Sequence, residues 1–324
     1  MPKIVLNGVG LNYRSVGQGP DVILVHGLAA NLAFWRLAAM RLLASRFRVT
    51  VYDLRGHGYS DMPPAGYTDA DLASDLKGLI DALGITRAHL VGHSYGGAVA
   101  LRYALDNPGQ VASLTVVDTR IPNLQPTLRK SEFPHWEIWR QRFQEAGFDV
   151  NDEQDLDFEI LEAFDDPRWR DLRRSLGGAR FFVPFEGLNG GQRGIKRWRG
   201  LLETTTARED LRQYRGPGPA AVSGLRFPAL AFYGEYSHCL ASGRGIVERV
   251  PGCRLAVCPE GGHFFPFVHP QRFAETVQQF IDDTEGVARQ AAGATRLPLA
   301  TGAPVAAAGT GAHGLSASGA GEDS

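Results

Sequence analysis

The sequence predicts an α/β fold: a doubly wound, mostly parallel sheet of eight strands, with helices on both faces and an inserted helical lid. Three observations support this prediction. Short apolar runs alternate with helical patterns along the chain. The alternation stops between residues 119 and 225 and then resumes. A Gly-x-Ser-x-Gly turn, Gly92 to Gly96, lies between a predicted strand and a helix of small residues.

The apolar runs place the strands in chain order. Val22–Val25 is continuously apolar, as expected for a strand buried on both faces of a parallel sheet. The other predicted strands are Ile4–Leu6, Leu11–Ser15, Phe47–Tyr52, Ala88–Val91, Ala112–Val117, Pro228–Gly234 and Cys253–Val257. Helices are predicted from Asn31 to about Ala44, from Thr68 to Ala82, after Gly97, and from Pro270 to Ile281.

The chain divides into a core, an insertion and a tail. Residues 1–118 and 226–284 form the predicted core, and residues 119–225 the lid, in which 131–146 and 153–164 have helical patterns. The lid carries Trp136, Trp139, Trp169 and Trp198, and packing is the commoner role of such residues. From about Glu285 to Ser324 the chain is mostly Ala, Gly, Ser and Thr with Pro, which predicts a disordered tail.

Composition excludes several classes of partner. With 34 basic and 35 acidic residues and a net charge of −1, the chain gives no electrostatic reason to expect nucleic acid or a membrane surface. Cys239, Cys253 and Cys258 have neither metal-ligand nor disulfide-framework spacing, so we expect reduced thiols and no metal. The first residues lack a signal-like apolar run, so we expect a cytoplasmic protein. We expect no cofactor. The expected partner is a small-molecule acyl substrate. A homodimer is also compatible with the sequence.

The chemistry of the Gly-x-Ser-x-Gly turn is nucleophilic. A serine hydroxyl such as that of Ser94 needs a base within hydrogen-bond reach and a third group that orients the base. His263 is the predicted base, because Gly262 and His263 follow the last strand, where this architecture places its base. The backbone N–H groups of Leu28 and Tyr95 are the predicted oxyanion hole.

The chain resembles the α/β-hydrolase fold superfamily from about residue 4 to 283, outside the lid. The matching segments are His26-Gly27, Asp53-Leu54-Arg55-Gly56-His57-Gly58-Tyr59-Ser60, Gly92-His93-Ser94-Tyr95-Gly96-Gly97 and Gly262-His263. This resemblance is specific for the fold and much less so for the reaction, because one fold hosts many chemistries. We interpret Arg55–Gly58 as a packed turn without a catalytic duty, and His26 as a residue that stiffens its own turn.

The acid is where the sequence departs from the family. The resemblance implies an acid three residues after Gly234, but Ser237 stands there, and a hydroxyl cannot carry the charge that stabilises an imidazolium. Asp118, at the end of the strand after the nucleophile helix, is the favoured acid, at a position that some relatives use. Glu235 is the alternative, and a missing third member is another. Asp118 could also serve only to cap a turn.

The predicted function is that of a serine hydrolase that cleaves a carboxylic ester or thioester of a hydrophobic small molecule through an acyl-enzyme on Ser94. Two alternatives stay open. One, implied by the resemblance, uses a His263–Asp118 dyad: a cofactor-free oxygenase in which serine is only a hydrogen-bond partner, or a carbon–carbon bond hydrolase or lyase, which lies between that case and the serine hydrolase. The other is a non-catalytic ligand-binding protein, against which the intact Ser94 and His263 argue. Dinucleotide binding is excluded, because the glycines do not form Gly-x-Gly-x-x-Gly.

Overall fold

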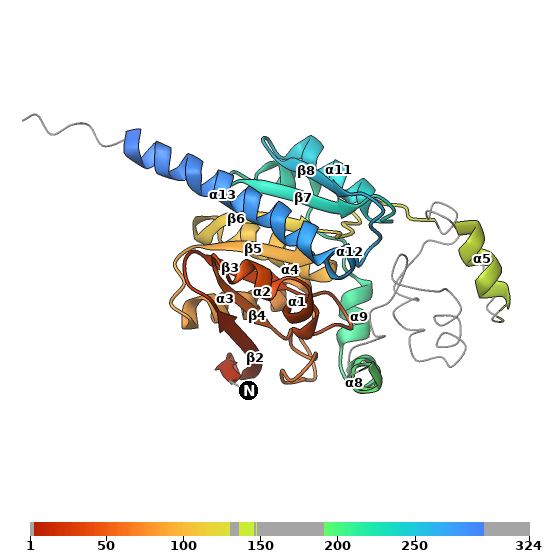
Figure 1. Ribbon diagram of the computed structural model, residues 1–324. Helices are drawn as coiled ribbons and strands as arrows, with labels where there is room; N and C mark the ends of the chain where they lie inside the picture. Colours follow the sequence, from red (N-terminus) through yellow and green to blue (C-terminus); the bar gives the residue numbers. More distant parts are fainter. Residues whose placement is uncertain (1–2, 130–135, 146, 148–190, 295–324) are drawn as a thin grey trace, which may run out of the picture. The chain divides into compact units, whose positions relative to one another are not determined.

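The centre of the molecule is one sheet of eight strands in the order β1-β2-β4-β3-β5-β6-β7-β8 (Figure 1). The computed structural model describes residues 3–129, 136–145, 147 and 191–294. The strands are β1 (Lys3–Leu6), β2 (Val9–Val16), β3 (Asp21–Val25), β4 (Arg48–Tyr52), β5 (Ala88–His93), β6 (Val111–Val117), β7 (Ala229–Gly234) and β8 (Arg254–Cys258). β2 pairs antiparallel with β1 and β4, and the other neighbours are parallel. The predicted fold class is confirmed.

The strand order reverses at β3, and this reversal positions the site. After β3 the chain crosses to β4 on one side, and after β4 it crosses back to β5 on the other side. The connections that leave β3 and β5 therefore diverge at the carboxyl edge of the sheet. In α/β sheets this topological switch point is where ligands bind. Val25 at the end of β3 lies in register with Gly92, the first residue of the serine turn.

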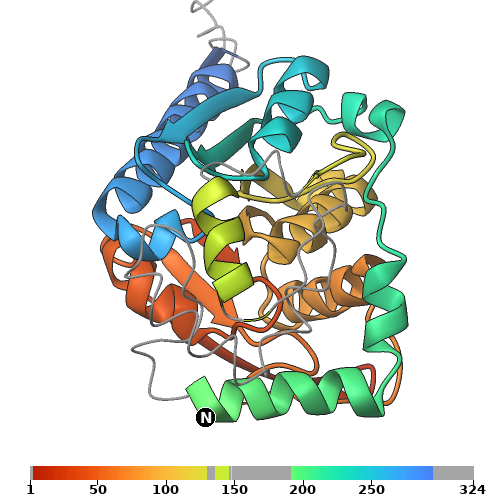
Figure 2. The same cartoon turned by 90° about the vertical axis from the view of Figure 1, so that its right-hand side faces the viewer.

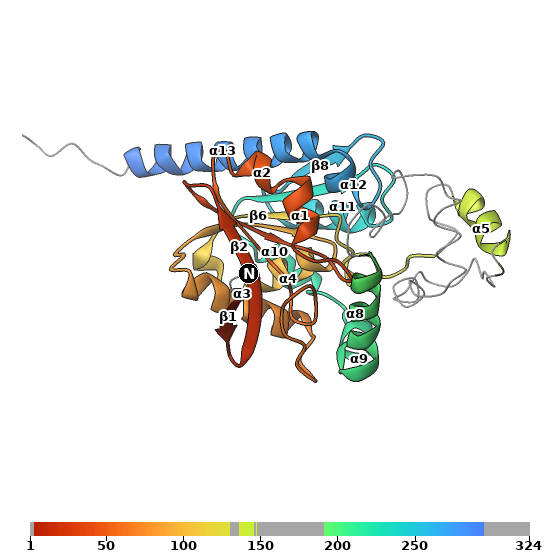
Figure 3. The same ribbon diagram turned by 60° about the horizontal axis from the view of Figure 1, so that its bottom comes forward.

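Alternating side chains of the strands bury the sheet under two layers of helices. Val22 and Leu24 contact α1 (Ala33–Ala38), α2 (Met40–Leu43), α12 (Phe265–Val268) and α13 (Pro270–Ala294). Ile23 and Val25 belong to the opposite core, with α3 (Asp69–Ala82), α4 (Tyr95–Asp106), α10 (Pro219–Ser223) and α11 (Leu240–Arg249). Figure 3 shows α1, α2, α12 and α13 along one face and α3, α4 and α10 along the other. Both faces of β3 are buried, as the continuous apolar run predicts.

The predicted helix from Asn31 to Ala44 is wrong in its continuity. The chain forms α1 and α2, with a break at Ala39, where φ is −134°. In one continuous helix Leu43 would lie opposite Phe34 and Met40 about 120° away from it, because side chains repeat every 3.6 residues. The break turns both segments toward the sheet, where Phe34, Met40 and Leu43 are all buried. Burial of both segments therefore outweighs helix continuity.

The predicted starts and ends of the other helices agree with the structure to different degrees. Thr68 caps α3 with a capping box: its hydroxyl accepts from Asp71 N–H, and the Asp71 carboxylate accepts from Thr68 N–H. At the other end of the chain, α13 continues past the predicted end at Ile281 to Ala294. Residues 285–294, predicted as part of a disordered tail, are thus helical, and alanine has the highest helix propensity. Residues 295–324 lie outside the described residues.

Between β6 and β7 four of the described segments are helices, whereas residues 119–129 form turns and extended chain. The helices are α5 (Trp136–Glu145), α8 (Gly191–Thr204), α9 (Ala207–Arg212) and α10, and a 3₁₀ turn (Pro108–Gln110) precedes β6. The predicted helix 153–164 and Trp169 lie outside the described residues. Trp136 and Trp198 are buried, which fits packing. None of the described helices combines the length and the hydropathy that crossing a bilayer demands.

Candidate active site

Ser94 is the single residue between the end of β5 and the start of α4. Its backbone has φ 55° and ψ −128°, a left-handed conformation that is strained for a residue with a side chain. Hydrogen bonds with surrounding groups stabilise this strained backbone conformation. The N–H of Ser94 donates to Val117 O at 2.9 Å, and its carbonyl accepts from Gly97 N–H and the Thr119 hydroxyl, each at 2.9 Å. The turn therefore presents the hydroxyl from a fixed backbone.

Two glycines bring the end of β3 against this turn. A methyl group on Gly96 would overlap the carbonyl oxygens of Val25 and His26, so the first turn of α4 packs directly on the end of β3. A methyl group on Gly27 would lie 2.8 Å from Ser94 Cβ. Only glycine at these positions permits such close approach. The turn after β3 thus lies beside Ser94, as the sequence predicts for the oxyanion turn.

His26 stiffens this turn through both of its ring nitrogens. The backbone N–H of Leu54 donates to Nε2 at 3.1 Å, so Nε2 carries no proton. Nδ1 must then carry it, and it donates to Gly27 O at 2.7 Å. Burial lowers the pKa of His26 to about 4, so the ring stays neutral near pH 7. The structural role predicted for His26 fits this geometry.

His57 also stabilises the turn after β3 through hydrogen bonds. The N–H of Ala29 donates to His57 Nε2 at 3.2 Å, and His57 Nδ1 donates to Arg55 O at 2.9 Å. Ala29 itself has a positive φ of 56°. Burial, with a smaller contribution from His26, lowers the pKa of His57 to about 3. The Arg55–Gly58 segment is a packed turn whose histidine anchors the oxyanion turn, a contact that the sequence analysis missed.

Of the two predicted oxyanion residues, Tyr95 follows Ser94 in the chain and Leu28 belongs to the turn that packs beside it. Leu28 lies between Gly27, which contacts Ser94, and Ala29, which is anchored to His57. Tyr95 is the first residue of α4, and the N–H groups of a first helical turn have no partner within the helix. Both peptide units therefore adjoin the place where a reacting carbonyl group would meet Ser94.

Asp118 follows β6 and is fully buried, with a positive φ of 46°. Its carboxylate is surrounded by donors. Oδ2 accepts from Gly234 N–H at 2.8 Å, and Oδ1 accepts from His263 Nδ1 at 2.8 Å and from the Ser237 hydroxyl. A buried carboxylate needs such compensation, and hydrogen bonds to a charged acceptor are strong. The structure thus brings Asp118 and His263 together.

The loop after β7 explains why the family's usual acid position can hold a serine. Ser237 donates its hydroxyl proton to Asp118, and its oxygen accepts from Cys239 N–H at 2.9 Å. It therefore supports the carboxylate that faces His263. Glu235, the alternative acid, is exposed, and its carboxylate accepts from Glu260 N–H at 2.9 Å. The Glu235 carboxylate thus bonds to the loop at Glu260, whereas the Asp118 carboxylate bonds to His263.

His93, the residue before Ser94, connects the serine turn to the loop that carries His263. Its Nε2 donates to the carbonyl of His263 at 2.8 Å, and the two rings lie 4.8 Å apart. On the other side it stacks on Phe34 at 4.8 Å. Burial, then the nearby His263, lowers the pKa of His93 well below the ordinary value. A sequence pattern treats this position as variable, so only the fold reveals the contact.

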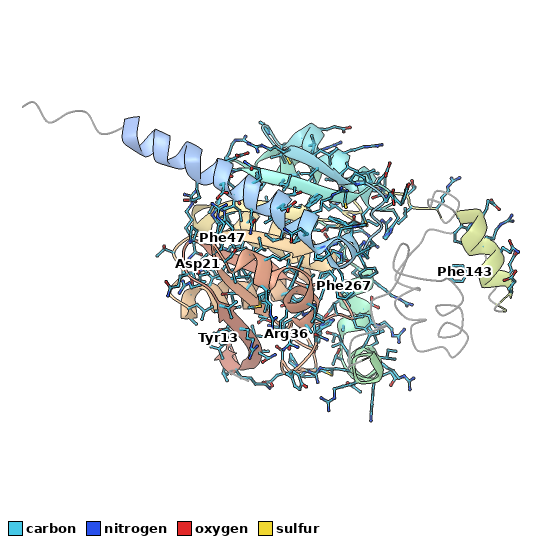
Figure 4. All side chains as sticks on the ribbon, viewed as in Figure 1. Tyr13, Asp21, Arg36, Phe47, Phe143 and Phe267 are labelled. Carbon is cyan, nitrogen blue, oxygen red and sulfur yellow. The ribbon has the colours of Figure 1, made fainter. Side chains whose placement is uncertain are left out.

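Aromatic side chains surround the two histidines. The Phe264 ring lies 4.9 Å from that of His263 and 5.7 Å from that of His93. Phe267, labelled in Figure 4, stacks over Phe34 at 6.3 Å. Phe264 and Phe267 are both half-buried. The surroundings of His263 therefore combine the apolar ring of Phe264 with the carboxylate of Asp118 and the rings of His93 and His238.

All of these groups follow the carboxyl ends of parallel strands. Ser94 follows β5, Asp118 follows β6, and the loops after β3, β7 and β8 supply the others. Figure 2 looks onto this edge of the sheet. An alcohol, an imidazole paired with a carboxylate, and two backbone N–H groups at one sheet edge are the components of acyl transfer.

Comparisons with known proteins agree with this arrangement. The model of the alpha/beta hydrolase fold family matches residues 20–270. The chain is 27% identical to 2-(acetamidomethylene)succinate hydrolase of Mesorhizobium japonicum over 86% of this chain and 94% of the relative. It is 30% identical to fluoroacetate dehalogenase of Burkholderia sp. over 85% of this chain and 91% of the relative.

A solved structure shows the same similarity. The esterase RhEst1 from Rhodococcus sp. ECU1013 superposes with a TM-score of 0.63 at 25% sequence identity. The match covers 86% of this chain and 97% of the esterase. The relatives named here are hydrolases that differ in the reaction they catalyse. By its sequence, its sheet and the family match, the chain belongs to the α/β-hydrolase fold family.

Proposed function

We propose that this protein is a serine hydrolase that cleaves a carboxylic ester or thioester of a hydrophobic small molecule. The observation that carries the proposal is the 2.8 Å hydrogen bond between His263 Nδ1 and the buried Asp118 carboxylate. With its proton at Nδ1, the ring has Nε2 to accept the proton of Ser94. Asp118 then orients the ring and stabilises the imidazolium that forms.

The reaction proceeds in two halves. Ser94 Oγ attacks the acyl carbon while His263 Nε2 takes the hydroxyl proton, and the carbonyl oxygen becomes an oxyanion that the N–H groups of Leu28 and Tyr95 stabilise. His263 gives the proton to the departing alcohol or thiol, which leaves an acyl group on Ser94. Water, deprotonated by His263, then releases the acid and restores the serine.

The surroundings of the site support the substrate class. Half-buried Phe264 beside His263 and His93, and half-buried Phe267 over Phe34, favour an apolar acyl or leaving group. The names of the relatives cover hydrolysis of an acetamidomethylene succinate, dehalogenation of fluoroacetate and ester cleavage. Of these, attack at a carbonyl suits an alcohol nucleophile beside two backbone N–H groups.

The test is pre-steady-state hydrolysis of p-nitrophenyl esters and matching thioesters of increasing acyl length. We expect a burst of one leaving group per protein molecule, followed by slower deacylation, and a rate that rises with acyl length. A serine-directed phosphonate should abolish the burst, and Ser94→Ala should lack it while it melts like the wild type. Ester turnover that survives in Ser94→Ala would refute the proposal.

The same dyad favours one second candidate. The His263–Asp118 pair is what a cofactor-free oxygenase or a carbon–carbon bond hydrolase needs, and Ser237 at the usual acid position accompanies it. The oxygenase reaction would use Ser94 only as a hydrogen-bond partner. Oxygen consumption with a hydroxylated heteroaromatic substrate that persists in Ser94→Ala, but disappears in His263→Gln, would favour this candidate over the hydrolase.

A further inference from the structure

Three side chains of types that commonly bind metals lie close together beside the His263–Asp118 pair. His238 and Cys239, in the loop after β7, and His263, in the loop after β8, each offer one ligand atom, and these three atoms lie within 4.8 Å of one another. The rings of His238 and His263 are 5.0 Å apart. Cys239 is buried, and the two histidines are half-buried. The spacing along the sequence conceals this group, because His263 comes from a different loop.

The backbone of the His238–Cys239 pair is fixed on both sides. Cys239 N–H donates to the Ser237 oxygen at 2.9 Å. The carbonyl of His238 accepts from Gln125 Nε2 at 2.8 Å, and Gln125 Oε1 accepts from the Ser242 hydroxyl at 2.8 Å. Buried Gln125 and Ser242 therefore hold this segment in place. Supporting hydrogen bonds of this kind are what keep a set of metal ligands oriented.

We propose that His238, Cys239 and His263 bind Zn²⁺, or another divalent cation that prefers nitrogen and sulfur ligands, and that the bound ion reversibly inhibits the enzyme. Two imidazoles and a thiolate suit Zn²⁺, which completes a tetrahedral site with a water molecule. On binding, the Cys239 thiol loses its proton to solvent and its sulfur donates an electron pair to the metal. The inhibition rests on the proposed function, whereas the binding does not.

The three ligand atoms need to move only slightly closer together to bind a metal ion. Bond lengths of about 2.3 Å to sulfur and about 2.1 Å to nitrogen place tetrahedral ligand atoms about 3.4–3.6 Å apart. The widest separation here is at most 4.8 Å, so the ligands must close by about 1 Å. Rotation of two half-buried imidazole rings supplies such a change without moving the fixed backbone.

The charges around the group favour a cation on balance. The Asp118 carboxylate interacts with Cys239, and a thiolate there would add a second negative charge. Arg120 opposes this, since its guanidinium acts on both His238 and Cys239. Burial raises the pKa of the Cys239 thiol, so the thiolate forms only on the metal; it and Asp118 then carry two negative charges against the one positive charge of Arg120. A divalent cation is therefore attracted to the group.

Coordination of His263 by either nitrogen stops the proposed chemistry. A metal on Nε2 occupies the electron pair that takes the proton of Ser94. A metal on Nδ1 replaces the hydrogen bond to Asp118. In both cases the base is lost while the fold remains intact, and a chelator that removes the ion should restore turnover.

The experiment titrates Zn²⁺ into chelator-treated full-length protein by calorimetry and Co²⁺ by absorption spectroscopy, with ester turnover measured in parallel. We expect one ion per molecule, tetrahedral cobalt bands with a thiolate charge-transfer band, and inhibition that follows binding. Cys239→Ser should lose the charge-transfer band and weaken Zn²⁺ binding at least about tenfold. The matched control is Cys253→Ser, whose half-buried thiol lies outside the group, and it should behave like the wild type.

The outcomes separate this proposal from the proposed function. Equal Zn²⁺ affinity in the wild type and Cys239→Ser, or a cobalt spectrum without the thiolate band, would overturn the site. Binding that leaves ester turnover unchanged would overturn the inhibition. Binding with the thiolate band in a protein without any hydrolase activity would refute the hydrolase and keep the metal site. If Cys239→Ser does not fold, His238→Gln tests the same loss of affinity.

Discussion

Two pairs of neighbouring histidines lie at the site, and they differ in what their ring nitrogens contact. The rings of His26 and His57 lie 5.5 Å apart, and all four nitrogens bond to backbone groups of two turns. The rings of His238 and His263 lie 5.0 Å apart, and His263 Nδ1 bonds to a carboxylate. Backbone partners fix a neutral ring as part of a turn. A carboxylate partner instead stabilises the protonated ring, which proton transfer requires.

The largest effect should come from replacing the base of the second pair. We expect His263→Gln to lower kcat for an ester by roughly 10⁶-fold, because the serine loses its proton acceptor. Thermal unfolding should change little, since the ring is partly exposed at the sheet edge. Stopped-flow assays with circular dichroism melting measure both. A decrease below about tenfold would show that His263 is not the base.

The acid gives the next largest contrast. Asp118→Asn should lower kcat by about 10⁴-fold, because an amide neither stabilises the imidazolium nor selects the correct tautomer. Glu235→Gln is the matched control, and we expect less than about a twofold change, as its exposed carboxylate serves only the loop at Glu260. Steady-state kinetics of the two variants decide between the acids, and the reverse ranking would assign the role to Glu235.

Replacing a histidine of the first pair should lower activity indirectly, because it changes the position of the oxyanion turn. In His57→Gln the anchor of Ala29 N–H is weakened, so the oxyanion turn loosens. We expect kcat to fall by about 10- to 100-fold, less than the loss of an oxyanion donor, with little change in KM. The free energy of unfolding should also fall by about 1–3 kcal/mol. Unchanged kcat in a destabilised variant would limit His57 to the fold.

The first pair also predicts how stability depends on pH. The pKa values of His26 and His57 are lowered from 6.5 to about 4 and about 3, so the unfolded chain binds more protons between these values and 6.5. Their contribution to stability is therefore present above pH 6.5 and is lost as the pH falls toward 3.

His57→Gln tests this contribution, because it removes one of the two groups. Its free energy of unfolding should fall less steeply below pH 6.5, by up to about 1.4 kcal/mol per pH unit. Urea unfolding at several pH values measures the slopes. Identical slopes for the variant and the wild type would show that His57 is not held neutral.

The smallest effect should follow truncation at the far end of the chain. A chain that ends at Gly286 keeps Glu285, which lies 3.3 Å from His89, and loses a segment poor in residues that can form a core. We expect unchanged melting and unchanged turnover, measured beside the full chain. A large decrease in either would show that residues 287–324 take part in packing or in the site.

The sequence was sufficient for the strands and for the parts of the site that lie in local motifs. Continuous apolar runs mark buried parallel strands such as β3, and Gly92–Gly97 marks the serine turn. Asp118 and His263 are 145 residues apart, and their contact depends on the loops that follow β6 and β8, between which β7 lies in the sheet. The motifs alone could therefore only rank Asp118 above Glu235.

What the sequence could not reveal depends on packing in three dimensions. The break at Ala39 arises because the segments on both sides of it must face the sheet. The contact between His93 and the backbone of His263, and the approach of His238 to His263, join loops that are distant in the chain. No local pattern of residues encodes these contacts.

The most direct test of the central claim is mass spectrometry of the protein quenched during turnover of a p-nitrophenyl ester. We predict an acyl group on the peptide that contains Ser94, at up to one per molecule, and its accumulation when deacylation is slowed in Asp118→Asn. An ester that is turned over without any acylated Ser94, or an acyl group found on another residue, would contradict the claim.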